Sequence, residues 1–99
     1  MTGKPADDEL RAELDRFRGE LDRVDSDLIR LIARRLELGL EAGRIKRALG
    51  QPVIDPEREA SVLEHARTWA REAKLPEDQV TDIVQRLISL SSRAQLESI

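Results

Sequence analysis

The spacing of the apolar residues in the first half of the sequence constrains the fold most. From Leu10 they recur at alternating intervals of four and three, at positions 10, 14, 17, 21, 24, 28 and 31. This spacing is typical of one face of an α-helix. It continues through positions 35, 38, 42, 45 and 49, and only Arg35 interrupts it. The pattern predicts one helix of roughly 38 residues, about 57 Å long at 1.5 Å per residue. A chain of 99 residues cannot cover such a face alone, so we expect an intertwined homodimer.

A second, shorter helix is expected after a clear break. The segment GQPV at positions 50–53 ends the long helix, because glycine suits the position after a helix and proline prevents continuation. Asp55 is a suitable N-cap, and Pro56 suits the first helical position. The apolar residues that follow predict that this helix extends to about Lys74.

A third helix is expected from the segment LPED at positions 75–78. Its apolar stripe leads to Ser91, Ala94 and Gln95 near the end of the sequence. The fold class is therefore all-α, with one very long helix and two shorter ones. We expect residues 1–9, which are polar, to be a disordered lead and residues 10–99 to form one domain.

The composition excludes several classes of function. There is no cysteine, and His65 is the only histidine, so we expect no metal site and no cofactor. Phe17 and Trp69 are the only aromatic residues, and the net charge is -3, which argues against a nucleic-acid partner. No apolar run approaches the ~20 residues of a membrane span. The first nine residues lack the apolar core of a signal peptide, so we expect no membrane association and a cytoplasmic location.

Three glycines lie within the predicted long helix. Gly19, Gly39 and Gly43 each cost the helix up to ~1 kcal/mol relative to alanine. They are either tolerated surface positions or points where another helix or a ligand approaches closely.

Polar residues interrupt the apolar faces at four positions. Arg35 lies on the long seam, and Lys46, eleven residues later, lies within about 20° of the same face. Ser91 and Gln95 are one turn apart on the third helix. Burial of an unpaired charge is very unfavourable, so the two cations need carboxylate partners or an anionic ligand. The alternative is structural: the arginine extends to solvent or forms an ion pair, and the serine and glutamine lie on a solvated helix end.

Two further arginines support an anion-binding site only when they are considered together with these four residues. Arg18 lies 17 residues before Arg35, which is ~25 Å along a helix, so no small ligand contacts both within one chain. If the long helices of two chains lie antiparallel, Arg18 of one chain approaches Arg35 of the other. Arg58 lies early in the second helix, where acids are normally favoured, which suggests an anion nearby. Each arginine alone could be a surface charge, and Arg58 could pair with Glu57 or Glu59.

The sequence as a whole resembles a known enzyme family. The segments FRGELDRVDSDLIRLIARRLELGLEAGRIK, PVIDPERE and SLSSRAQ are similar, in order and spacing, to the all-helical AroQ class of chorismate mutases. The resemblance extends from about residue 10 to residue 97. It implies a dimer of three-helix chains with two active sites, each built from both subunits. The implied reaction rearranges chorismate to prephenate, in the shikimate pathway that leads to aromatic amino acids.

The resemblance also implies roles for eight residues. Arg18 matches an arginine that the other subunit donates to a substrate carboxylate, and Arg35 matches one supplied within the same chain. Lys46 and Gln95 match the two donors to the breaking ether oxygen. The other four match residues that bind the substrate: Asp55 and Glu59 at its hydroxyl group, and Arg58 and Ser91 near a carboxylate.

The residue types suit this chemistry independently of the resemblance. Chorismate is a dianion, so several cations and no metal are sensible. The rearrangement needs no nucleophile and no proton transfer. It needs the reacting atoms held in a compact geometry and hydrogen-bond donors where negative charge develops.

Three alternatives remain. Isochorismate-pyruvate lyases are similar in fold, but they have a shorter connection after the lysine and an apolar residue in place of Glu59. A 4-amino-4-deoxychorismate mutase is a second enzymatic alternative, although Asp55 and Glu59 suit a hydroxyl group better. The third is a non-catalytic helical dimerisation module, which predicts that replacement of Arg35, Lys46, Ser91 or Gln95 has no cost to any activity.

Overall fold

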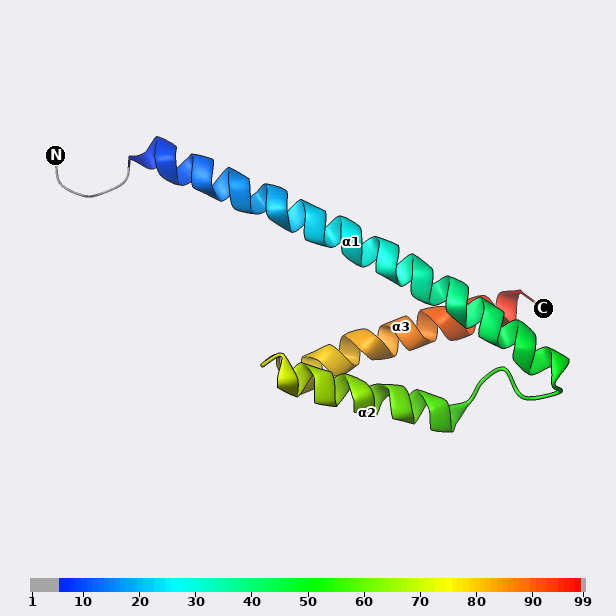
Figure 1. Ribbon diagram of the computed structural model, residues 1–99. Helices are drawn as coiled ribbons and strands as arrows, with labels where there is room; N and C mark the ends of the chain where they lie inside the picture. The colour runs from blue at the N-terminus through cyan, green and yellow to red at the C-terminus, as the bar shows by residue number, and fades with distance from the viewer. Residues whose placement is uncertain (1–5, 99) are drawn as a thin grey trace. The chain divides into compact units, whose positions relative to one another are not determined.

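The computed structural model describes residues 6–98 as three helices. They are α1 (Asp7–Ala48), α2 (Pro56–Glu72) and α3 (Glu77–Glu97) (Figure 1). No strand occurs within 6–98, so the predicted all-α class, with one very long helix and two shorter ones, is confirmed. The lead expected over residues 1–9 is helical from Asp7 onward. Its residues 1–5 lie outside the described part.

The end of α1 is set by a glycine, as predicted. Gly50 has φ 71°, a backbone conformation that glycine adopts without steric cost. Its N–H donates to the Arg47 carbonyl at 3.0 Å, and the Gln51 N–H donates to the Lys46 carbonyl at 2.8 Å. These two bonds form a Schellman motif, which satisfies carbonyls that the helix itself leaves open.

The described residues divide into two units, one up to Ala33 and the other from Arg34 onward. In the first unit, the predicted apolar seam of α1 is exposed. Its seven side chains are between 47% and 65% accessible, and they are Leu10, Leu14, Phe17, Leu21, Val24, Leu28 and Leu31. An amphipathic helix needs a partner for such a face. Coverage of this face by a second chain stays a prediction.

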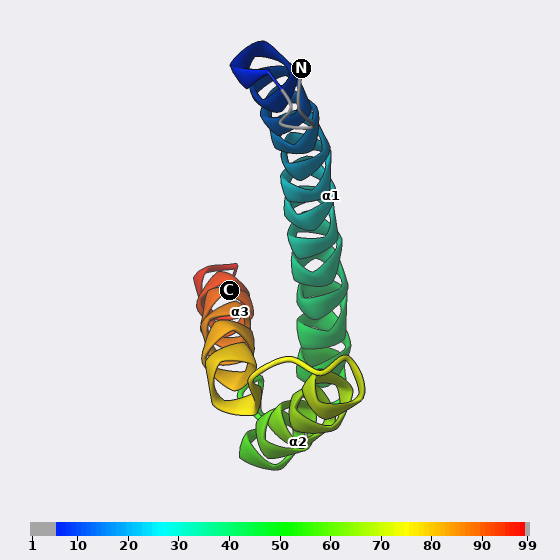
Figure 2. The same ribbon diagram turned by 90° about the vertical axis from the view of Figure 1, so that its left-hand side faces the viewer.

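In the second unit, α2 and α3 pack against each other, and Figures 1 and 2 show them side by side. Asp55 is the N-cap of α2, as predicted, because its Oδ1 accepts a hydrogen bond from the Arg58 N–H at 3.1 Å. Ala66, Ala70 and Ile88 are the buried apolar residues of this unit. The small alanines on α2 allow close helix packing, and this small core fixes the two helices that line the site.

The turn between α2 and α3 contains the one non-glycine residue of positive φ among residues 6–98, Lys74 at φ 60°. The Lys74 N–H donates to the Arg71 carbonyl at 3.1 Å, and the Leu75 N–H donates to the Ala70 carbonyl at 2.8 Å. This is a second Schellman motif, with lysine in the place where glycine is usual. The left-handed conformation costs a residue with a Cβ roughly 1–2 kcal/mol.

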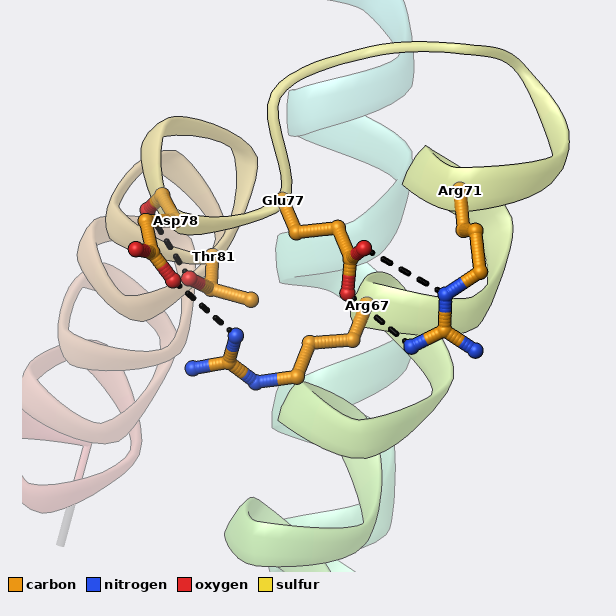
Figure 3. Close-up of polar contacts among 5 residues, drawn as sticks. All are labelled: Arg67, Arg71, Glu77, Asp78 and Thr81. Carbon is orange, nitrogen blue, oxygen red and sulfur yellow. Dashed lines mark hydrogen bonds and ion pairs between the residues drawn. The ribbon is translucent and has the colours of Figure 1, made fainter.

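Ion pairs connect the end of α2 to the start of α3 (Figure 3). Arg71 Nη2 lies 3.0 Å from Glu77 Oε1, and Arg67 Nη1 lies 3.1 Å from Asp78 Oδ1. The Thr81 hydroxyl donates to the Asp78 carbonyl at 2.8 Å. The hydrogen bond from Arg71 lowers the pKa of Glu77, and the same bond raises the pKa of Arg71. The two ion pairs are exposed, so each contributes little to stability.

Candidate active site

A cavity of about 330 Å³ lies in the second unit. Its walls come from the C-terminal part of α1, the connection before α2, the first turns of α2 and the last turns of α3. This volume suits a small metabolite. Seven of the eight predicted site residues line it: Arg35, Lys46, Asp55, Arg58, Glu59, Ser91 and Gln95. The eighth, Arg18, lies in the first unit and does not line this cavity.

Two half-buried cations of α1, Arg35 and Lys46, face the cavity. Arg35 Nη1 donates to the Leu87 carbonyl at 3.4 Å, and Lys46 Nζ donates to the Val53 carbonyl at 3.2 Å. Neither takes part in an ion pair with a carboxylate of residues 6–98. Main-chain carbonyls orient the two side chains but do not neutralise them, which favours an anionic ligand over the ion-pair alternative.

Ser91 and Gln95 form the opposite wall on α3. They are buried, with 7% and 9% of their surface accessible, so they do not lie on a solvated helix end. Gln95 Nε2 donates to Ser91 Oγ at 3.1 Å, which leaves the second N–H of the amide for another acceptor.

Two of the three helix glycines make room for this wall. A Cβ on Gly43 would lie 3.2 Å from Gln95 Cγ, and a Cβ on Gly39 would collide with Ser91 Oγ. At these two positions, close approach by another helix is therefore the alternative that holds. Gly19, in contrast, has no atom within 4 Å of an added Cβ, as expected for a surface position.

The start of α2 contributes two carboxylates and a third cation. Asp55 and Glu59 are half-buried, whereas Arg58 is exposed. Ser92 Oγ donates to Glu59 Oε1 at 3.2 Å, and Ser92 also lines the cavity. The sequence prediction missed Ser92. Its position four residues after Ile88 places it on the same stripe of α3, and that signal could have identified it.

Other classes of site find no support in the part of the chain described. Within residues 6–98, no three histidine, cysteine, aspartate or glutamate side chains are grouped so that they could hold a metal. Over the same residues, no helix has the length and apolar content needed to cross a membrane.

Comparison with protein families gives a clear match. Residues 17–96 match the family described as chorismate mutase type II. The chain belongs to this family. The matched range includes all eight predicted site residues, among them Arg18 in the first unit.

Two of the individual proteins similar to this chain are named as mutases, in agreement with this assignment. A chorismate mutase of Methanocaldococcus jannaschii is 32% identical over 87 residues, which cover 88% of this chain and 81% of the relative. A 4-amino-4-deoxychorismate mutase of Streptomyces venezuelae is 31% identical over 95 residues, covering 96% and 85%. The T-protein of Enterobacter agglomerans is 42% identical over 77 residues, which cover 78% of this chain. The matched part is only 21% of that T-protein, so the chain spans about a fifth of such relatives.

Proposed function

We propose that this chain catalyses the rearrangement of chorismate to prephenate, a step of aromatic amino acid biosynthesis. The observation that carries the proposal is the cavity in which Arg35 and Lys46, without carboxylate partners, face the buried Ser91 and Gln95. A dianionic substrate supplies the counter-charge that the two cations do not receive from a carboxylate of residues 6–98. Membership of the chorismate mutase type II family supports the same reaction.

Arg35 and Arg58 of the cavity bind the substrate carboxylates, together with Arg18 of a second chain. Arg35 projects from α1 and Arg58 from the first turn of α2, so the two approach from different walls. The planar guanidinium group donates two parallel hydrogen bonds to a carboxylate, which fixes its orientation as well as its position. Two carboxylates held at separate points force the substrate into the folded conformation that the rearrangement requires.

Lys46 and Gln95 donate to the ether oxygen, where negative charge develops as the C–O bond breaks. Gln95 is an amide and needs no added proton to donate, so its role predicts no steep fall in activity between pH 6 and pH 8. The main-chain carbonyl of Val53 holds Lys46, and Ser91 holds the Gln95 amide. Donors fixed in this way need little reorganisation during the reaction. Loss of one typically costs about 3–4 kcal/mol of transition-state stabilisation.

Asp55 and Glu59 accept a hydrogen bond from the substrate hydroxyl group. One Glu59 oxygen already accepts from Ser92, so this carboxylate is held in a fixed orientation with its other oxygen open. A carboxylate pair could also bind an ammonium group. Because one relative is named as a 4-amino-4-deoxychorismate mutase, the amino analogue of chorismate is the second candidate substrate.

The first experiment is to incubate the purified chain with chorismate and identify the product. Prephenate is expected, and Lys46→Ala should abolish its formation. Arg44→Ala is the matched control, because Arg44 is an exposed cation on the same helix that pairs with Glu41. Turnover of the 4-amino analogue or of isochorismate, but not of chorismate, would reassign the substrate. No turnover of any of the three compounds would leave the dimerisation module as the better explanation.

The proposed active form is a homodimer in the cytoplasm, with Arg18 of one chain reaching the cavity of the other. The exposed seam of α1 within residues 7–33 supports a second copy as partner. Arg18→Ala and Arg35→Ala should each inactivate the enzyme, because every site then lacks one arginine. Mixed dimers of the two variants should regain activity, since one of their two sites has both arginines. No recovery after verified subunit exchange would refute the shared site.

A further inference from the structure

Within the second unit, three residues of α1 spaced four apart face the last two turns of α3. They are Gly39, Gly43 and Arg47. The two glycines leave room for the side chains of Ser91 and Gln95. Residues at i, i+4 and i+8 lie on one face of a helix, so Arg47 occupies the next place in this row. Figure 1 shows this end of α1 passing the C-terminal end of α3.

Arg47 contacts the main chain of the residue whose side chain lies in the cavity. Its Nη2 donates to the Gln95 carbonyl and, at 3.4 Å, to Ser98 Oγ. Ser98 Oγ in turn donates to the same Gln95 carbonyl at 3.0 Å. Gln95 is among the last four residues of α3, where carbonyls lack the usual partners within the helix. A cation is also favoured there by the helix dipole.

The other surroundings of Arg47 do not suggest a different role for its side chain. Among residues 6–98, no carboxylate forms an ion pair with it. Its Nε is buried without a hydrogen-bond partner, which is unfavourable. It does not line the cavity, so any effect on the reaction must pass through another residue.

We propose that Arg47 is a positioning residue for Gln95. By binding the Gln95 carbonyl, it holds the last turn of α3 against α1 and so keeps the Gln95 amide in the cavity with Lys46. Helix ends fray readily when their terminal groups lack partners. Without Arg47 the amide would sample positions away from the ether oxygen. The inference rests on the proposed mutase function, because the contact with Arg47 matters for activity only if Gln95 donates to the ether oxygen.

The test compares Arg47→Leu with Arg47→Lys, with Arg44→Leu as the control on the exposed face of α1. We expect Arg47→Leu to lower kcat about tenfold with a change in KM below about threefold, because Gln95 acts mainly in the transition state. Arg47→Lys should recover part of the loss, since an ammonium group can still donate to the carbonyl. The Arg44→Leu variant should match the wild type.

A double-mutant cycle separates positioning from a general structural effect. In a Gln95→Ala background, Arg47→Leu should change kcat by less than about twofold, because residues that act through one another are not additive. Full additivity of the two losses would overturn the proposal. Equal activity of Arg47→Leu and the wild type would overturn it as well.

Hydrogen exchange gives a readout that does not depend on activity. In Arg47→Leu, amides of residues 92–98 should exchange faster, whereas those of residues 77–88 should be unchanged. Unchanged exchange in the last turn would refute the claim that Arg47 holds this turn of α3 against α1. If the wild-type chain does not convert chorismate at all, the proposed function fails instead. The exchange result then decides separately whether Arg47 holds this turn.

Discussion

The substitution Gly43→Ala tests how closely the geometry of the site depends on the contact between α1 and α3. The added Cβ would lie 3.2 Å from Gln95 Cγ, 3.2 Å from its Oε1 and 3.4 Å from its Cδ. The first two distances are shorter than ordinary van der Waals contact, so the Gln95 side chain must shift by a few tenths of an ångström. We therefore expect reduced activity with nearly unchanged stability.

The magnitudes follow from two opposing effects on stability and one effect on activity. Alanine stabilises a helix by up to about 1 kcal/mol relative to glycine, whereas overpacking typically costs about 1–3 kcal/mol. Because only one flexible side chain has to move, we expect the overpacking cost near its lower limit and a net change below about 1 kcal/mol. A misplacement of about 1 Å can cost about 100-fold in rate, so a few tenths of an ångström should cost about threefold to tenfold in kcat/KM.

The assay combines urea unfolding with initial rates on chorismate. Gly19→Ala is the matched control, because it has the same effect on helix propensity and has no atom within 4 Å of the new Cβ. It should gain stability and keep full activity. The Gln95→Ala background removes all three atoms that crowd the new Cβ, so there Gly43→Ala should be stabilising. Wild-type activity of Gly43→Ala, or further destabilisation in the Gln95→Ala background, would refute the reasoning.

Three further substitutions probe other contacts. Ser92→Ala should raise the KM for chorismate about threefold to tenfold, because Glu59 loses a hydrogen bond of roughly 0.5–1.5 kcal/mol. Ser92→Thr keeps the hydroxyl group and should raise the KM less. Equal kinetics of Ser92→Ala and wild type would contradict the role of Ser92 in orienting Glu59. The pKa of Glu77 is lowered by Arg71, so its stabilising contribution is present above the ordinary carboxyl pKa of 4.5 and is lost as the pH falls through the lower folded value. Glu77→Gln should therefore be slightly less stable than wild type in thermal unfolding at pH 7 and equally stable at strongly acidic pH, and a difference independent of pH would exclude this linkage. Lys74→Gly should raise the free energy of unfolding by about 0.5–1 kcal/mol, because glycine adopts positive φ without the Cβ penalty. A loss of stability in urea unfolding would show that the Lys74 side chain stabilises the fold by more than its backbone conformation costs.

The sequence predicted the helices well because local rules determine their limits. The apolar spacing extends along α1, and Asp55 and Gly50 have the backbone geometry expected of a cap and a stop signal. The start of α1 at Asp7 was missed, because the prediction relied on apolar spacing and α1 has three acidic residues in its first turn. Such acids favour a helix start through the helix dipole. The positive φ of Lys74 could not be predicted, because lysine gives no signal for that conformation.

The site was predictable as a set of residues but not as a set of contacts. Arg35 and Lys46 were identified because a cation on an apolar face is costly. Their acceptors are main-chain carbonyls of Leu87 and Val53, which every residue possesses and which no sequence pattern marks. The contact of Arg47 with α3 was missed for the same reason. Such pairings depend on how two helices cross, and that crossing is fixed by tertiary packing rather than by local spacing.

The exposed seam of α1 has a consequence for how the protein behaves on dilution. Seven large apolar side chains between positions 10 and 31 are about half accessible in the single chain, so a partner that covers them contributes to folding itself. If that partner is a second copy, folding and association are one equilibrium governed by mass action. Each tenfold dilution then lowers the apparent stability by about 1.4 kcal/mol of dimer. The working concentration of the protein, and not its sequence alone, would then decide how much of it is folded.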